Sequence, residues 1–221
     1  YDINSDQEAI NTRDGESGII TLEFDVADNQ TLKSITSFQE MDRFLRDDLD
    51  STDANLFGQN NYTEQSESWR QEVTYNFSGD RLDVLAGAMY FEEELYGQVL
   101  VPLTNICALL APELCGTPVG DFLSTGRYEQ NGDVDIEAYG IYAEASYQLT
   151  EAFKIIAGVR YNYEERSGTG AFVFDAAGLD VPTNQSEDWS DVTPRLTVEF
   201  EPNDNMLLYA TYNQAFAQWA C

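Results

Sequence analysis

The sequence of 221 residues contains no histidine, and it has only 11 lysine and arginine residues against 40 aspartate and glutamate residues. The absence of histidine excludes histidine-based catalysis and histidine–metal sites, because both need an imidazole ring. The formal net charge of −29 argues against a nucleic acid as partner, because the neutralisation of phosphates requires a basic surface. Two interpretations of the charge stay open, namely solvated acidic loops and an acidic surface for cationic or metal-bearing ligands.

Long hydrophobic stretches are also missing. No run of ~20 apolar residues exists, so the sequence predicts no transmembrane helix. Residues 1–18 are polar and lack the basic start and apolar core of a secretory signal, so we expect either that a signal was removed or that the chain is an internal piece of a longer protein. A β-barrel is compatible with this hydropathy, because polar residues alternate with apolar ones in its strands.

Cysteine is scarce, with Cys107, Cys115 and Cys221 as its three occurrences. The first two lie eight residues apart in one expected loop. They can close that loop as a disulfide in an oxidising envelope compartment, with a contribution of ~2–3 kcal/mol to stability. Two cysteines without a histidine do not make up a usual metal-ligand set, so no metal site is expected there.

Residues 134–166 contain two runs in which apolar and polar residues alternate, with a few turn-like residues between them. The apolar side consists of Tyr139, Ile141, Ala143, Ala145, Tyr147 and Leu149 in the first run and of Phe153, Ile155, Ala157, Val159, Tyr161 and Tyr163 in the second. A period of two predicts strands with one apolar and one polar face. Each run reaches the ~9–11 residues that a tilted strand needs to cross a membrane.

The same hairpin pattern repeats along the chain. Strands are expected at 18–27, 31–40, 67–77, 81–96, 138–149, 153–164, 189–200 and 206–216. In 81–96 the second face carries Leu85, Gly87, Met89 and Phe91, which are not polar, and this indicates contact with something packed inside a barrel and not with open water. Pro194 is expected near a strand start or at a bulge, because proline cannot donate a ladder hydrogen bond.

The connections alternate in length. Short turns are expected after 27, 77, 149 and 200, and long connections at 41–65, 97–132 and 167–188. Outer-membrane barrels have short periplasmic turns and long extracellular loops, and only a closed barrel satisfies the backbone of strands in lipid. The predicted fold is therefore all-β, an antiparallel up-and-down transmembrane β-barrel segment of about eight strands. A soluble β-sandwich is the alternative fold, although long strands with outward aromatic residues argue against it.

Two of the long connections hold candidate binding features. The 41–65 connection carries Asp42, Asp47, Asp48, Asp50 and Asp53. These acids are candidates for cation binding, but they lack the glycine and the ordered spacing of a calcium loop. The 97–132 connection contains LTNICALLA between Pro102 and Pro112, which we expect either as a short helix in a ligand-contacting apolar patch or as a loop packed on itself.

The stretch WSDVTPRLTVEFEPNDNMLLYATYNQAF at 189–216 resembles the barrel of TonB-dependent outer-membrane receptors, which often show W-S-x-x-T-P-[KR] followed by a short turn and L-[LV]-Y-A-[ST]. LKSITSF at 32–38, SWRQEVTYNF and RLDVLAGAMYFEEE within 68–94, and 138–166 are similar to other strands of that family. The family usually continues the last strand with a basic residue, Gly-Phe and further glycines, whereas this chain reads NQAFAQWAC.

The resemblance implies that residues 1–221 are a partial barrel domain, one part of a barrel of twenty-two strands, and that the preceding plug domain is absent. It also implies an outer-membrane location in a Gram-negative bacterium and contact with outer-membrane lipid. The implied function is TonB-coupled import of scarce solutes of the siderophore, haem, cobalamin or oligosaccharide class. The long loops would capture the ligand, and the TonB complex would act only through a plug.

Other functions are weighed against this one. A self-contained eight-stranded barrel with a structural or adhesive role would require residues 18–27 to pair with 206–216. An enzyme is not expected, because no carboxylate pair has a distinguishing spacing and Ser146 and Ser190 lack a G-x-S-x-G context. No catalytic residue, metal ligand or cofactor is therefore assigned. Tyr96, Trp189 and the 97–132 segment are possible ligand contacts, with interfacial anchoring as the alternative for the aromatic residues.

Overall fold

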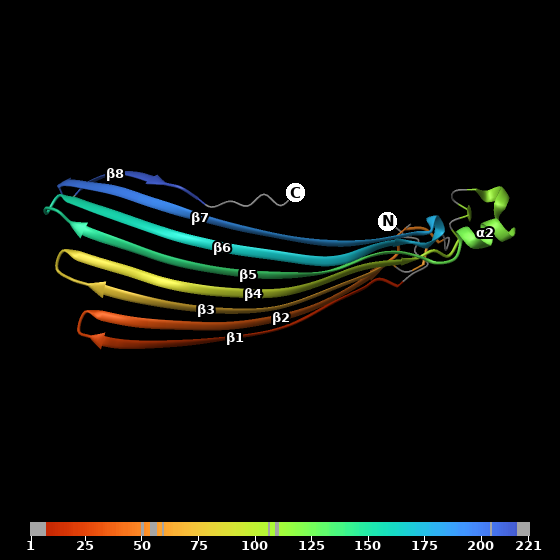
Figure 1. Ribbon diagram of the computed structural model, residues 1–221, viewed down its shortest axis with the longest axis horizontal. Helices are drawn as coiled ribbons and strands as arrows, with labels where there is room; N and C mark the ends of the chain where they lie inside the picture. The colour runs from red at the N-terminus through yellow and green to blue at the C-terminus, as the bar shows by residue number, and fades with distance from the viewer. Residues whose placement is uncertain are drawn as a thin grey trace.

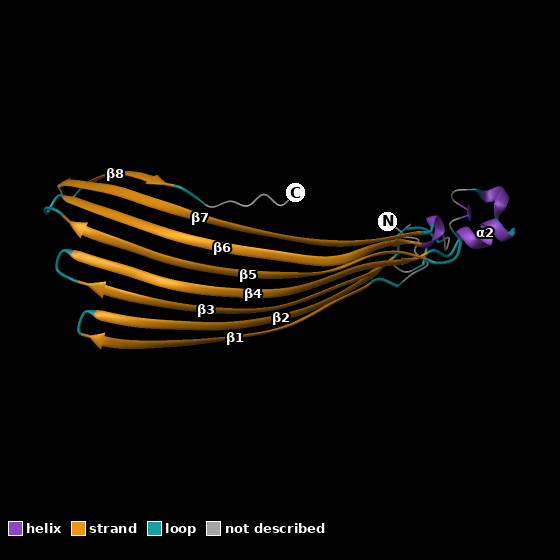
Figure 2. Ribbon diagram, viewed as in Figure 1, coloured by secondary structure: helices purple, strands orange, loops and turns teal. Residues whose placement is uncertain are grey.

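The computed structural model describes residues 8–49, 51–53, 57–58, 60–105, 107–108, 111–203 and 205–215. Eight strands make up nearly all of this part of the chain (Figures 1 and 2). They are β1 (Ile10–Ala27), β2 (Gln30–Asp47), β3 (Asn60–Ser78), β4 (Leu82–Pro102), β5 (Arg127–Gln148), β6 (Phe153–Phe174), β7 (Leu179–Asn203) and β8 (Met206–Asn213).

The strands form one antiparallel sheet in the order β1-β2-β3-β4-β5-β6-β7-β8, so each strand pairs with its neighbours in the sequence. The prediction of an all-β up-and-down sheet of about eight strands is thereby confirmed. We call the end of the sheet with the tight turns after β1, β3, β5 and β7 the turn end, and the opposite end the loop end. Within the described residues β1 pairs only with β2 and β8 only with β7, so the pairing that a self-contained eight-stranded barrel requires is not present.

The strands reach much further toward the loop end than the alternation predicted. The expected connection at 167–188 is wrong, because β6 continues to Phe174 and β7 begins at Leu179 with only a four-residue turn between them. The connections after β2 and β4 also shrink, to 48–59 and 103–126. β3, for example, already begins at Asn60, inside the 41–65 segment that was expected to be a loop.

The reason for this error lies in the polarity of the two faces of the sheet. Periodic alternation arises only where one face is apolar and the other polar. At the loop end polar residues occupy both faces, as in TGRYEQNGDVD at the start of β5 and SGTG within β6. The backbone ladder is unbroken there, from Tyr128 opposite Phe174 to Gln148 opposite Lys154. Composition rich in glycine, serine and aspartate therefore marked a strand with two polar faces and not a loop.

The connection between β4 and β5 is the most elaborate one. A disulfide joins Cys107 to Cys115, whose Cα atoms lie 5.5 Å apart. A 3-10 turn η1 (Pro112–Leu114) and a short helix α2 (Pro118–Leu123) follow, and Thr117 caps α2 by accepting from the amide of Gly120. The helix predicted within LTNICALLA lies partly outside the described residues, and the described helix α2 comes after it, beyond the ends of the strands in Figure 1.

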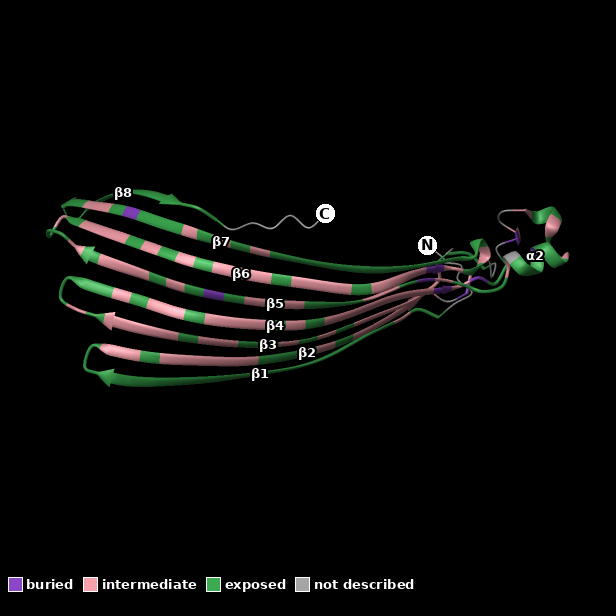
Figure 3. Cartoon of the chain, in the orientation of Figure 1, coloured by how far each residue is buried: buried purple, intermediate pink, exposed green. Residues whose placement is uncertain are grey.

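The sheet is a single layer, and most of its side chains are intermediate or exposed (Figure 3). Buried apolar residues in the described part are Val101, Leu103, Cys107 and Val173, all at or beyond the loop end. No helix among the described residues is long and apolar enough to cross a membrane. The fold therefore has no conventional core, and the environment on its two faces must supply what a core supplies elsewhere.

Pro194 lies in the middle of β7, so the expectation of a position at the strand start or at a bulge is wrong. Its carbonyl accepts a hydrogen bond from the amide of Gln214, just after β8 ends. In an antiparallel ladder the nitrogen and carbonyl of one residue face the same neighbour. The missing N–H therefore points toward the end of β8, where it interrupts no further ladder bond to β6.

Candidate functional site

The register divides the sheet into two faces of different chemistry. We call the face with Ile141 and Val159 the outer face and the face with Tyr142 and Arg160 the inner face, since directly opposite residues share a face. Ile141 and Val159 are 61% and 50% exposed, whereas Tyr142 and Arg160 are only partly exposed. The inner face is the more crowded one, as expected for the concave side of a curved sheet.

The apolar part of the outer face is a belt bounded by two levels of aromatic rings. Near the turn end the rings of Phe153 and Phe200 stack with their centroids 4.4 Å apart. Toward the loop end Tyr139 and Tyr163 stack at 4.8 Å, and Trp69 contacts Tyr90 at 5.6 Å on the neighbouring strand pair. Along β6 the belt runs from position 153 to position 163, which matches the ~9–11 residues of a membrane-crossing strand.

Above this belt the outer face is strongly acidic. Two cross-strand rows place carboxylates directly opposite one another, namely Glu16, Glu40, Glu67, Glu94 and Asp135 in one row and Glu92, Glu137, Glu165 and Asp188 in the other. Hollows of about 300 Å³ and 370 Å³ lie along these rows. Like charges in directly opposite positions destabilise a sheet, so these rows oppose the stability that the backbone ladder provides.

Two of the acidic candidates for ion binding at 41–65 accept hydrogen bonds between strands, and Asp48 accepts from the backbone amide of Ser51 within the connection. Asp42 accepts from the side-chain amide of Gln65 at 2.7 Å, and Asp47 accepts from that of Asn60 at 2.7 Å. Asp50 lies outside the described residues. Across the described ranges no group of three or more acidic or cysteine side chains has a metal-binding arrangement.

The inner face carries most of the cations, and most of them are paired. Five ion pairs lie on this face: Arg43–Glu64, Arg70–Glu72, Lys154–Glu199, Arg166–Glu164 and Arg195–Glu144. Arg43–Glu64 and Lys154–Glu199 join directly opposite residues, and Arg70–Glu72 and Arg166–Glu164 join residues two positions apart in one strand. Arg195–Glu144 reaches across β6, where Gly158 lies between the two residues. The inner face therefore holds most of the cations of a strongly acidic chain in ion pairs, whereas the outer face has an acidic rim.

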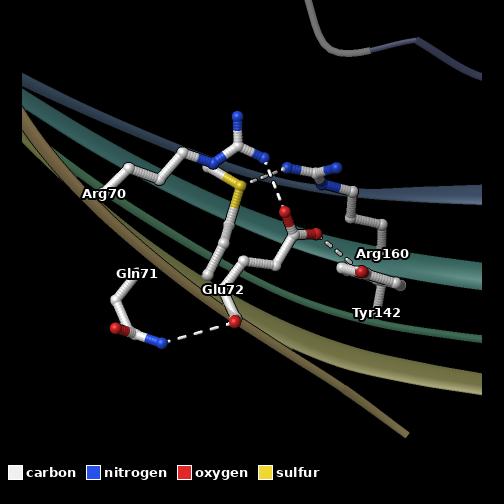
Figure 4. Close-up of polar contacts among 6 residues, drawn as sticks. Arg70, Gln71, Glu72, Tyr142 and Arg160 are labelled. Carbon is white, nitrogen blue, oxygen red and sulfur yellow. Dashed lines mark hydrogen bonds and ion pairs between the residues drawn. The ribbon is translucent and has the colours of Figure 1, made fainter. Parts of the chain in front are cut away.

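A cluster at the middle of the inner face links four strands (Figure 4). The hydroxyl of Tyr142 on β5 donates to Glu72 on β3 at 2.8 Å, and Arg70 donates to the other oxygen of Glu72 at 2.7 Å. The guanidinium of Arg160 on β6 lies 5.7 Å from the centre of the Tyr142 ring and donates to the sulfur of Met89 at 3.3 Å. Glu72 is thus held by two partners, whereas Arg160 has only neutral partners.

A glycine makes this cluster possible. Tyr142 reaches Glu72 across β4, where Gly87 is its direct opposite. A Cβ atom at position 87 would lie 2.5 Å from Cζ and 2.6 Å from the hydroxyl oxygen of Tyr142. The expectation that the second face of 81–96 meets something packed inside a barrel stays a prediction; within the described residues Gly87 and Met89 meet Tyr142 and Arg160 of the same sheet.

Aromatic side chains gather on the inner face at the loop end. Tyr128 on β5 contacts Phe172 and Phe174 on β6, with ring centroids 5.5 Å and 6.5 Å apart. Tyr62 on β3 lies in the same cross-strand row as Phe172, with Val99 and Gln130 between them. The row below consists of Gly97, Gly132 and Gly170, and the space above Gly97 is open.

Tyr62 and Glu129 have shifted pKa values at this end of the sheet. Burial, reinforced by its hydrogen bond to Glu64, raises the pKa of Tyr62. Hydrogen bonds from the side-chain amides of Asn131 and Gln98, both at 2.8 Å, lower the pKa of the Glu129 carboxyl, and the charge of Arg127 acts in the same direction. Glu129 is one of the two buried polar residues in the described part. Its hydrogen bond from Gln98 joins the side chains of β5 and β4 at the loop end.

The residues singled out from the sequence do not come together. Tyr96 is on the outer face beside the acidic hollow, whereas Trp189 is on the inner face opposite Glu164. Ser146 and Ser190 lie on different strands and different faces. The aromatic cluster around Tyr128 was missed because its segments were expected to be loops; the i, i+2 spacing of Phe172 and Phe174 was the signal that could have found it.

The sequence model of a family described as "TonB dependent receptor-like, beta-barrel" matches residues 1–218. The ferric-pyoverdine M114 receptor PbuA of Pseudomonas sp. strain M114 is 31% identical over 84 residues, which is 38% of this chain and 10% of that protein.

Solved structures share the fold at low sequence identity. The ferric yersiniabactin uptake receptor FyuA from Yersinia pestis superposes with a TM-score of 0.72 and 14% identity over 92% of this chain and 28% of its own. The siderophore receptor PiuA from Acinetobacter baumannii gives 0.65 and 14% over 96% and 33%. The ferric-catecholate import receptor Fiu from E. coli K12 gives 0.63 and 15% over 96% and 36%. The chain thus spans about a third of the length of these structures, and the prediction that it is not an enzyme is confirmed by the receptors it matches.

Proposed function

The chain belongs to the family of TonB-dependent receptor-like β-barrels, and from this premise we propose that it is part of the wall of an outer-membrane receptor that imports a ferric siderophore. The observation that carries the proposal is the two-faced sheet. Its outer face has an apolar belt of membrane height between aromatic levels, and its inner face is polar and carries five ion pairs. Such a wall suits lipid on one side and a polar lumen on the other.

In this arrangement the turn end lies in the periplasm and the loop end outside the Gram-negative cell. The long strands then continue beyond the outer leaflet and carry the 48–59 and 103–126 connections into the medium. The unpaired edges of β1 and β8 call for further strands, because an open edge in lipid leaves backbone groups without partners. We therefore assign residues 1–221 to a partial barrel domain whose remaining strands lie outside it.

The ligand class follows from the relatives together with the inner face. The receptors that resemble the chain are described as taking ferric pyoverdine, ferric yersiniabactin and ferric catecholates. A ferric chelate with flat aromatic groups would find the rings of Tyr128, Phe172 and Phe174 at the loop end, above a floor of glycines. The acidic rows on the outer face lie away from this path. Haem, cobalamin and oligosaccharides have no comparable support.

Energy coupling would come from the TonB complex acting on a plug domain within the lumen. The proposal for this chain is that the inner-face cluster around Glu72 and Tyr142 faces that lumen at mid-height. Arg160, which has no carboxylate partner among the described residues, would offer its remaining donors to the lumen. The coupling step itself is assigned to a plug outside these residues.

Uptake by the natural-length protein in iron-starved cells tests the proposal. Cells that lack the gene should lose accumulation of radioactive iron from one chelate among ferric pyoverdine, ferric catecholate and ferric citrate probes, and the wild-type gene should restore it. Phe172→Ala should weaken binding of that chelate by about tenfold, since a stacked ring contributes about 1–1.5 kcal/mol.

Tyr96→Ala is the matched control, because this ring lies on the outer face of the neighbouring sheet region. It should bind the chelate as the wild type does. Normal iron uptake from every probe in the deletion strain would refute the proposed function, whereas equal losses in the two variants would refute only the assignment of the ligand to the inner face.

A further inference from the structure

Two arginines are directly opposite each other on the inner face near the loop end. Arg13 on β1 pairs with Arg43 on β2, and Arg43 is also directly opposite Glu64 on β3. Within the register of the described strands, this is the one position where two cations are directly opposite. Like charges in such positions repel each other, so an anion between the two guanidinium groups would relieve the repulsion.

The carboxylate beside this pair is already shared between two side chains. Arg43 lies 3.6 Å from Glu64 and 5.5 Å from the centre of the Tyr62 ring, and the hydroxyl of Tyr62 donates to Glu64 at 3.2 Å. Arg13 donates to the sulfur of Met41 at 2.9 Å and has no carboxylate partner among the described residues. The side chain of Arg43 is 37% exposed. The pair therefore keeps most of its N–H donors for an external group.

The acids that adjoin the two arginines in the sequence lie on the other face. Asp14 follows Arg13 and Asp42 precedes Arg43, and the register places the two aspartates directly opposite each other on the outer face. Successive side chains of a strand point to opposite faces, and the Debye length is ~8 Å at physiological ionic strength. A group on the inner face therefore meets two guanidinium groups and one carboxylate, although the chain as a whole is strongly acidic.

The row that contains the two arginines continues over backbone without side chains. Gly97, Gly132 and Gly170 follow Glu64 in this row on β4, β5 and β6, and a Cβ atom at Gly97 would meet nothing within 4 Å. Three neighbouring strands span ~10 Å, which leaves room for a bulky group beside the arginines. The charges select an anion over a cation, and the glycines accept one larger than a single side chain.

We propose that Arg13 and Arg43 bind the negative charge of an anionic ferric chelate, so that the chelate this wall takes is an anion and not a neutral or cationic complex. The proposal rests on the proposed function, because it names the charge of the chelate that the inner face would bind. Guanidinium groups bind the oxygen atoms of anions through charge-assisted hydrogen bonds. Ferric tris-catecholates and ferric citrate are anions, whereas a ferric ion held by three hydroxamates is neutral.

Binding of three chelates to the natural-length protein in detergent, followed by quenching of its tryptophan fluorescence, tests the proposal. The probes are a ferric tris-catecholate, ferric citrate and a neutral ferric tris-hydroxamate. The wild type should bind one of the two anionic probes, and added salt should weaken this binding. Arg13→Gln should weaken it about tenfold, since the variant loses charge-assisted hydrogen bonds. Arg13→Lys keeps the charge and should restore part of the affinity.

Lys33→Gln is the matched control, because it removes the same charge from the inner face of β2 nearer the turn end, opposite Glu23. It should bind the anionic probe as the wild type does. Heat-modifiable mobility in gels reports the folding of each variant, and the salt dependence of the wild type tests the proposal without any variant. Binding that is independent of salt, equal affinities of Arg13→Gln and Lys33→Gln, or binding of the neutral probe alone would overturn the proposal. Failure of the wild type to bind any of the three chelates would instead count against the proposed function.

Discussion

Alanine at position 87 should destabilise the protein, although alanine usually stabilises a strand relative to glycine. The added Cβ would lie 2.5 Å from Cζ of Tyr142, so the ring has to leave its place across β4. Glu72 then loses the hydroxyl donor at 2.8 Å, and Arg160 loses the ring that lies 5.7 Å away. The substitution therefore breaks the inner-face cluster from the one position in it that has no side chain.

The magnitude follows from three contributions to the free energy of unfolding. A hydrogen bond to a charged group contributes about 1.5–3 kcal/mol, and a cation–π contact about 0.5–1 kcal/mol. Replacement of a strand glycine by alanine by itself stabilises the folded protein by about 0.5–1 kcal/mol, because it lowers the entropy of the unfolded chain. The net loss for Gly87→Ala is then about 1–3 kcal/mol.

Urea unfolding of the protein in phospholipid vesicles, followed by tryptophan fluorescence, measures this difference. Gly97→Ala is the matched control, because Gly97 is also on the inner face of β4 and its Cβ would meet nothing within 4 Å. The control should unfold at the wild-type urea concentration or slightly above it. In a Tyr142→Ala background the loss caused by alanine at 87 should disappear. Equal midpoints for the two alanine variants in the wild-type background would refute the reasoning.

Two further predictions concern the loop end. The pKa of Glu129 is lowered in the folded protein by its hydrogen bonds, so its contribution to stability is present above the unfolded value of ~4.3 and is lost as the pH falls through the lowered folded value. The protection factors of amides at the β4–β5 loop end, which are exchange rates corrected for the intrinsic rate at each pH, should therefore fall in acid for the wild type. They should stay constant with pH for Glu129→Gln, which loses about 1–2 kcal/mol at neutral pH; protection factors that fall equally in the variant would contradict this. Protease should cleave the 103–126 connection many times faster in Cys107→Ser than in the wild type, since the crosslink contributes ~2–3 kcal/mol. Val119→Ser, on the exposed side of α2, is the control and should leave the cleavage rate unchanged. Equal rates in the two variants would mean that the disulfide does not hold the connection.

The half of the sheet with the apolar belt could be predicted from the sequence because its two faces differ in polarity, which gives the sequence a period of two. Ile141 and Val159 face one environment while Tyr142 and Arg160 face another, so the chain alternates and the strand is visible. The strand order also followed, because short turns force neighbouring strands to pair in antiparallel fashion. Only the identity of neighbours two or more strands apart, such as Tyr142 and Glu72, requires the register.

The loop-end half could not be predicted in the same way. Gly168 and Gly170 in β6 lie opposite Val134 and Gly132 in β5, and a glycine-rich strand looks like a loop when only its letters are considered. The disulfide was anticipated from the spacing of Cys107 and Cys115, whereas the acidic rows were not, because each row draws its members from different strands. Charges far apart in sequence meet only once the register is known.

The length of the strands determines how far the wall extends beyond the apolar belt. From Tyr163 at the upper aromatic level to Phe174 at its end, β6 climbs about 35 Å along its own direction at ~3.3 Å per residue, or about 27 Å along the membrane normal at a tilt near 40°. In a bilayer, as proposed, the loop end of the wall would lie well above the lipid head groups. A solute would then meet the wall beyond the lipid head groups, and a stiff hydrogen-bonded wall, not a flexible loop, would guide its first few nanometres of descent.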